Sequence, residues 1–223
     1  MEKMPFQEPR AAVDAVVSTV PLPAHAPSST DWRTGLPTLV GTLVTLRELR
    51  ITDAPALFVS LTTEDVARFI SPPPTTVEGF ERFITWAHRQ RAAGQYVCFA
   101  VVARASDIAI GLFQIRSLEP GFGTAEWGFA IAYEFWGTGA FMDGATLALD
   151  FAFGVVGSHR LEARAATVNG RGNAALRKLG ARREGVLRKS LLRNGQYLDQ
   201  WLWTIIDEEW LETKATWGSP IIH

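Results

Sequence analysis

The fold of this chain is decided by the stretch Ala125-Glu-Trp-Gly-Phe-Ala-Ile-Ala-Tyr-Glu-Phe-Trp-Gly-Thr-Gly-Ala-Phe-Met-Asp-Gly-Ala-Thr-Leu-Ala-Leu-Asp-Phe-Ala-Phe153. Its first seven residues form an apolar run typical of a strand, the glycines at 137 and 139 indicate a turn, and the remainder has an apolar helical face. A helix that starts directly after a strand exposes unpaired backbone N–H groups, and its dipole favours negative charge there. This order therefore predicts a phosphate-binding site at the start of the helix.

The segments around this stretch predict one α/β domain, with a mixed and mostly antiparallel sheet and helices on both faces. Further strands are expected at residues 43–49, 96–102, 108–116, 160–166, 186–192 and 197–206. Helices are expected after Asp53, after the capping box Thr75-Thr-Val-Glu78, and over residues 172–179. We place the domain at residues 37–210, between an N-terminal extension (1–36) that is partly irregular and a C-terminal tail (211–223).

Composition favours an ordinary globular protein in a reducing compartment. The 223 residues are 47% hydrophobic and 20% charged, and the net charge of −1 gives no general attraction to nucleic acid or to a membrane surface. The one cysteine, Cys98, excludes an intramolecular disulfide. Ala24-His25-Ala26 is similar to a signal cleavage site, but Asp14, Pro21 and Pro23 interrupt the segment before it. We expect a cytoplasmic protein.

Charge is unevenly distributed along the chain. Ten Lys or Arg residues lie between Arg160 and Arg193, against two acids, Glu162 and Glu184. This cluster is either a solvated face or a patch for the outer phosphates of an anionic ligand. Nucleic-acid binding is a weaker alternative, because no nucleic-acid motif accompanies the cluster.

Two common phosphate-binding motifs do not fit the glycine turn. A Walker A loop requires a lysine after its last glycine, and none follows Gly139. A dinucleotide fingerprint requires a third glycine where Met142 stands.

The turn instead resembles that of the GCN5-related N-acetyltransferase (GNAT) superfamily, which reads Arg/Gln-x-x-Gly-x-Gly/Ala. The matching residues are Trp136, Gly137, Thr138, Gly139, Ala140 and Phe141. The tryptophan is similar to the Tyr-Trp-Gly-Lys-Gly version of the ribosomal-protein N-terminal acetyltransferase (RimJ/RimL-like) branch. Residues 159–164 resemble the family's fifth strand, and Asn169 stands where the family has an asparagine that contacts CoA. Residues 177–188 resemble the family's Lys-Leu-Gly-Phe…Glu-Gly-Val-Leu-Arg run. The resemblance covers roughly residues 43–206.

Three residues depart from the family pattern. Phe141 replaces a small residue, so its ring must turn away from the ligand, and Gly172 stands where this branch often has serine. Leu176 stands where many members have the tyrosine that protonates the leaving thiolate. The general acid is therefore not identifiable from the sequence.

The resemblance implies acetyl-CoA as the acyl donor and a fourth strand that splays from the fifth. The residues it places on the cofactor, together with those near the expected cofactor path, are Phe129, Ala130, Ile131, Trp136, Gly137, Thr138, Gly139, Ala140, Phe141, Asn169, Asn173 and Lys178. A backbone amide near Phe129 would polarise the acetyl carbonyl in the manner of an oxyanion hole. Asn173 has a second interpretation as a local capping residue.

Glu126 is the candidate general base, and its alternative is a strand-edge glutamate exposed to water or paired with an arginine. Cys98 lies in an apolar run and is interpreted as a core thiol, and His159 as a structural or surface residue. The four histidines do not have metal-ligand spacing, so direct transfer without a metal or an acyl-enzyme is expected.

The acceptor stays open at this point. The sequence is compatible with a protein N-terminus or with a small-molecule amine such as a polyamine, an amino acid or an aminoglycoside. A non-catalytic acyl-CoA-binding module is the alternative function. Tyr197, Trp201 and Trp203 alternate on the last strand, where they pack the sheet, line the acceptor site or form a homodimer contact.

Overall fold

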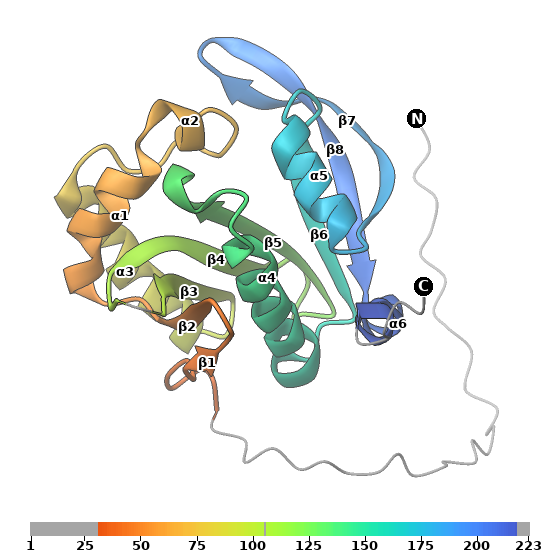
Figure 1. Cartoon of the computed structure of the whole chain (residues 1–223), viewed down its shortest axis with the longest axis horizontal. Coiled ribbons are helices and arrows are strands. Elements are labelled where there is room, and N and C mark those ends of the chain that lie inside the picture. Colours follow the sequence, from red (N-terminus) through yellow and green to blue (C-terminus); the bar gives the residue numbers. More distant parts are fainter. Residues whose placement is uncertain (1–30, 105, 218–223) are drawn as a thin grey trace, which may run out of the picture.

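A computed structural model describes residues 31–104 and 106–217 of the chain. They form an eight-stranded sheet of order β1-β2-β3-β4-β5-β6-β8-β7, with helices on both faces (Figure 1). The strands are β1 (Leu39–Val40), β2 (Val44–Glu48), β3 (Tyr96–Ala103), β4 (Ala109–Ser117), β5 (Thr124–Ile131), β6 (Arg160–Ala166), β7 (Arg182–Arg193) and β8 (Gln196–Ile206). The helices are η1 (Ile51–Asp53), α1 (Ala54–Leu61), α2 (Glu64–Ala67), α3 (Val77–Ala92), η2 (Tyr133–Phe135), α4 (Ala140–Phe151), η3 (Ala152–Val156), α5 (Gly170–Lys178) and α6 (Asp207–Trp217). The predicted fold class is confirmed.

Side chains alternate between the two faces of the sheet and build two cores. On β5, Ala125, Trp127 and Ile131 belong to the core that includes Ala140, Ala145 and Ala148 of α4. Ala130 belongs to the opposite core, which α1 and α3 cover. Because the period of a strand is two residues, Glu126 and Gly128 also face the α1 and α3 side.

The pairing of β5 with β6 is parallel and short. It joins residues 124–126 to residues 160–162, whereas β4 pairs with β5 from Ala125 to Ile131. Beyond Glu126, therefore, β5 is paired only with β4, and β6 is paired only with β8. This is the splay that the family resemblance implied.

The predicted domain boundaries, between residues 36 and 37 and between 210 and 211, stay predictions. Trp32 lies in the predicted extension, is 6% exposed, and packs edge-on against Phe122 with ring centroids 5.6 Å apart. Helix α6 crosses the second boundary, and Trp210 on it is 1% exposed. Residues 1–30 and 218–223 lie outside the described part. Within residues 31–104 and 106–217, the helices are too short or too polar to cross a lipid bilayer.

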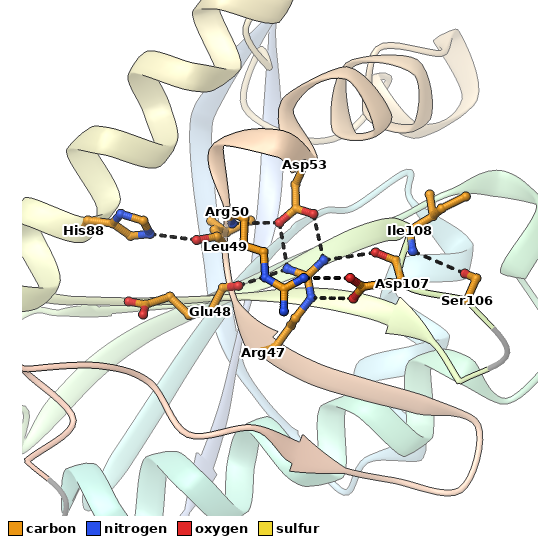
Figure 2. Close-up of polar contacts among 9 residues, drawn as sticks. All are labelled: Arg47, Glu48, Leu49, Arg50, Asp53, His88, Ser106, Asp107 and Ile108. Carbon is orange, nitrogen blue, oxygen red and sulfur yellow. Dashed lines mark hydrogen bonds and ion pairs between the residues drawn. The ribbon is translucent and has the colours of Figure 1, made fainter.

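A buried ion pair fixes the start of α1 to the sheet (Figure 2). Arg47 on β2 donates from Nη1 and Nη2 to the two carboxylate oxygens of Asp53, each over 2.8 Å. The side chains are 7% and 5% exposed. The Asp53 carboxylate also accepts from the backbone N–H of Arg50, and exposed Asp107 accepts from Arg47 Nε. The hydrogen bond from Arg47 is the largest cause that lowers the pKa of Asp107.

We expect Asp53→Ala to lower the free energy of unfolding by about 3–5 kcal/mol, because it leaves the Arg47 guanidinium buried without its main partner. The matched control is Asp107→Ala, since Asp107 contacts the same guanidinium but its side chain is 71% exposed. That control is expected to leave the free energy of unfolding nearly unchanged, because water screens an exposed ion pair. Urea denaturation of both variants measures the difference, and equal losses would contradict this account.

Candidate active site

A cleft of about 640 Å³ crosses the gap between β5 and β6. Its floor is the α1 and α3 face of β4 and β5, and its walls come from α3, from the loop of residues 69–74, from α5 and from β7. Of the predicted site residues, the cleft brings together Glu126, Phe129, Ala130 and Asn169.

Backbone groups of β5 face the gap. Thr124 accepts from Leu118 and Ala132 donates to Ile110, so even-numbered residues of this strand bond to the β4 side. In an antiparallel pair the residues between them point their N–H and C=O groups the other way. Phe129 and Ile131 therefore direct their backbone into the gap, whereas Ala130 contributes its side chain alone.

Trp136 connects the end of β5 with α5. Its Nε1 donates to the carbonyl oxygen of Ile131 over 2.8 Å, and the Arg171 guanidinium lies over its ring, 4.6 Å from the centroid. The indole thus satisfies one of the carbonyl groups that β6 leaves unpaired. It also holds the glycine turn beside the gap.

The glycine turn has the backbone conformation that its sequence requires. Gly137 has φ +77° and Gly139, which precedes α4, has φ +93°. A Cβ at Gly139 would also lie 3.0 Å from Leu43 Cδ1. Thr138 Oγ1 donates to Phe135 O and accepts from the N–H of Ala140. The next amides of the first turn, at Phe141 and Met142, have no carbonyl within the helix to bond.

The ring of Phe141 packs against the sheet. Its centroid lies 4.5 Å from that of Phe129 and 6.0 Å from that of Phe113. A large residue at this position is accommodated because its ring joins an aromatic cluster between α4 and β4–β5, while its amide keeps its place in the first turn.

Asn169 and Asn173 hold the start of α5. Asn169 Oδ1 accepts from the N–H of Gly172 over 2.9 Å, and a Cβ at Gly172 would lie 2.6 Å from Asn169 Nδ2. Asn173 Nδ2 donates to Ala166 O and Asn169 O, and its Oδ1 accepts from Trp203 Nε1. The Asn173 amide thus joins β6, α5 and β8. Through this hydrogen bond, Trp203, one of the three aromatic residues of β8 noted in the sequence, connects β8 to α5.

The two remaining α5 positions differ in burial. Leu176 is 1% exposed and lines the cleft, so an apolar side chain occupies the position at which the family resemblance would place a tyrosine. Lys178 is exposed in the last turn of α5 and is not among the residues that line the cleft.

Glu126 lies between two arginines on the cleft floor. Arg116, its register partner on β4, donates from Nη2 to Glu126 Oε2, and Arg164 Nε lies 3.8 Å from Oε1. The Glu126 side chain is 23% exposed. This is the arginine pairing that the sequence left open as an alternative, and it places the carboxylate at the cleft surface, where a substrate can reach it.

Sequence reasoning missed Tyr96 and Gln114, which lie on the neighbouring strands β3 and β4 of the cleft floor. The Tyr96 hydroxyl donates to Gln114 Oε1, and both residues line the cleft. Burial raises the pKa of Tyr96 well above its ordinary value. The sequence feature that could have indicated Gln114 is its polarity, because it is the one polar residue in the otherwise apolar run of residues 109–115.

His159 and most of the basic cluster lie elsewhere. His159, just before β6, has its Nδ1 atom 2.9 Å from Asp207 Oδ1. The side-chain atoms of His159, Asp207 and Glu208 that could bind a metal ion lie within 4.8 Å of one another, and the three residues are exposed or half-exposed. Arg160 pairs with Glu162 and Glu184. Its hydrogen bond is the main cause that lowers the pKa of Glu184 to about 2.

Comparison with known proteins decides the family. A model of the acetyltransferase (GNAT) domain matches residues 44–182. The chain belongs to the GNAT family. It is an N-acetyltransferase, and the enzymes of this family use acetyl-CoA.

This N-acetyltransferase is 24% identical over 174 residues to the uncharacterized N-acetyltransferase p20 of Bacillus licheniformis, covering 78% of this chain and 98% of p20. Mycobacterium smegmatis RimJ, solved in complex with CoA-disulfide, has a TM-score of 0.71 at 22% identity and covers 78% of this chain and 89% of its own. The ribosomal-protein-S5-alanine acetyltransferase of Vibrio fischeri has a TM-score of 0.69 at 21% identity, covering 78% of this chain and 98% of its own. These two structures show the shared fold.

We expect Gly139→Ala to weaken CoA binding by about tenfold, because alanine disfavours a positive φ by about 1–2 kcal/mol and the relaxed loop must be restored on binding. Gly154→Ala is the control: Gly154 lies beyond the other end of α4, and a Cβ there meets open space. Isothermal titration with CoA measures both. Wild-type affinity in the Gly139 variant would contradict the role of this turn.

Proposed function

We propose that this N-acetyltransferase moves the acetyl group of acetyl-CoA directly to a primary amine, either a protein N-terminus or a small-molecule amine. The observation that carries the proposal is the gap between β5 and β6, which opens into the cleft that contains Glu126. The start of α4 follows the same strand, so an anion site and an acyl site adjoin each other.

The proposed donor site uses backbone groups. The first-turn amides of α4 suit a pyrophosphate, because they are free donors at the positive end of the helix dipole. The Phe129 backbone, directed into the gap, suits the polar groups of an extended pantetheine arm, and its N–H can polarise a thioester carbonyl. RimJ of M. smegmatis, which shares this fold, was solved with a CoA disulfide.

In the proposed transfer, the amine nitrogen bonds to the acetyl carbon and the carbon–sulfur bond breaks, so that CoA leaves as its thiolate. The nitrogen loses one proton, which Glu126 accepts directly or through water. An acyl-cysteine is disfavoured because Cys98, the one cysteine in the chain, is buried and its pKa is raised to about 12 by burial. A thiol in that state is a poor nucleophile.

Glu126→Gln tests the proposed base. Removal of a general base slows transfer by about 10²–10⁴-fold, while CoA affinity should be retained because the proposed donor site uses backbone groups. The decline of kcat/KM at low pH should remain in the variant, because it comes from protonation of the amine, so the loss of rate is best measured near pH 9, where more of the amine is neutral. Thiol release measured over a panel of amines between pH 5 and 9 gives both results.

The matched control is Glu162→Gln. Glu162 is the register partner of Glu126 on β6 and pairs with Arg160, but it does not line the cleft. Its variant should keep the wild-type transfer rate near pH 9. A wild-type transfer rate near pH 9 in the Glu126 variant would remove this residue as base, and CoA binding without thiol release on any amine would favour the acyl-CoA-binding module.

A further inference from the structure

We propose that the cleft selects an acceptor in which the reactive amine is flanked by a carbonyl group and a bulky apolar or aromatic side chain, as in the first residue of a peptide. The inference rests on the proposed function, and it assigns acceptor recognition to Gln114 and Trp86. Three features of the cleft support it: one oriented amide donor, one aromatic wall and the balance of charge.

The amide donor is Gln114 Nε2. The Tyr96 hydroxyl donates to Gln114 Oε1, which turns the Nε2 group toward β5. Gly128 leaves it room, since a Cβ at that position would lie 3.0 Å from Nε2. Gly128 is two residues from Glu126 on the same face, so a carbonyl oxygen that accepts from Nε2 would place an adjacent amine near the Glu126 carboxylate.

The aromatic wall stands on the other side of Gln114. The rings of Trp86 and Tyr96 are 4.9 Å apart, and those of Phe83 and Trp86 are stacked at 6.1 Å. Trp86 is 39% exposed and lines the cleft, so its ring is accessible to an apolar group of the acceptor. Tyr96 and Glu126 are in register with Arg116 on either side of β4, and are therefore separated by about 10 Å, two strand spacings. A large side chain beside the amine can bridge that distance.

The charges of the cleft disfavour polycations. Arg116 and Arg164 outnumber Glu126 among its ionised lining residues, and the raised pKa of Tyr96 keeps that hydroxyl neutral. A second ammonium group on the acceptor would meet this positive balance. An α-amine has a pKa of about 7.7–8.0 against about 10.4 for a lysine-type amine, so it is neutral far more often at pH 7. A neutral amine is the form that attacks a thioester.

A second hollow gives the remainder of a peptide a path. It has a volume of about 560 Å³ and shares Trp86, Tyr96 and Arg116 with the cleft. Gln90, Gln95 and Ser117 also line it, and their polar groups suit a peptide backbone. A peptide is favoured over a free amino acid because only a peptide continues beyond its first residue into this second hollow.

The test compares acceptors that differ in one recognition feature, with each kcat/KM divided by the fraction of the amine that is neutral at the assay pH. With phenylalanine amide as reference, alanine amide lacks the large side chain, phenethylamine lacks the carbonyl, and spermidine adds charge. We expect kcat/KM to fall about tenfold or more for alanine amide and several-fold to about tenfold for phenethylamine. A tripeptide that begins with phenylalanine should match or exceed the amide, and free phenylalanine should be poorer.

Two variants assign the recognition. Gln114→Leu should abolish the preference for phenylalanine amide over phenethylamine while it keeps the preference over alanine amide. Trp86→Ala should do the reverse. Val59→Ala, on the exposed face of α1 and outside the cleft, is the control that retains both preferences. Thermal unfolding verifies that each variant is folded.

Equal or better turnover of spermidine, alanine amide or phenethylamine would overturn this inference and leave the proposed function intact. Absence of thiol release with every amine would instead defeat the proposed function. The selectivity is then read from equilibrium dialysis of labelled phenylalanine amide and labelled phenethylamine against the protein saturated with CoA. Binding that neither discriminates between these two compounds nor weakens in Gln114→Leu would overturn the inference.

Discussion

The early end of the β5–β6 pairing is the constraint on which the rest of the structure depends. A strand inside a sheet offers hydrogen-bonding groups to both neighbours in alternation, so the departure of β6 after Glu126 leaves one set unpaired. The Trp136 indole satisfies the carbonyl of Ile131, and Phe129 remains open to the cleft. The same departure separates β5 from α5 and creates the volume of the cleft.

The glycine turn and the alternating strands could be predicted because their signals are local. These signals are glycine at positions 137 and 139, both of which adopt a positive φ, and a period of two in the strands. The splay had no local signal and came only from the family resemblance. The requirement for glycine at position 172 could be explained only from the structure, because the Asn169 side chain occupies the space that a Cβ would need. The pairing of Tyr96 with Gln114 depends on the register of β3 and β4, which one sequence does not specify.

The basic cluster between Arg160 and Arg193 shows how linear charge is dispersed by folding. Arg164 pairs with Glu126 at the cleft, while Arg160 pairs with Glu162 and Glu184 on the sheet. Arg171 and Arg183 stack on Trp136 and Trp201 from different elements. Strand residues alternate between faces and helix residues rotate, so ten charges within one segment need not form one patch.

The ion pairs of Glu126 connect its proposed role as base with the proposed choice of acceptor. Arg116 and Arg164 hold the carboxylate by charge, so an arriving ammonium ion would have to compete with two guanidinium groups for it. In the proposed transfer a neutral amine does not face this competition, because it needs from Glu126 only the removal of a proton after attack. The arrangement thus favours amines that are already deprotonated near neutral pH. In the proposed complex such an acceptor is bound by neutral groups of the cleft, the Gln114 amide and the aromatic wall, rather than by the Glu126 carboxylate.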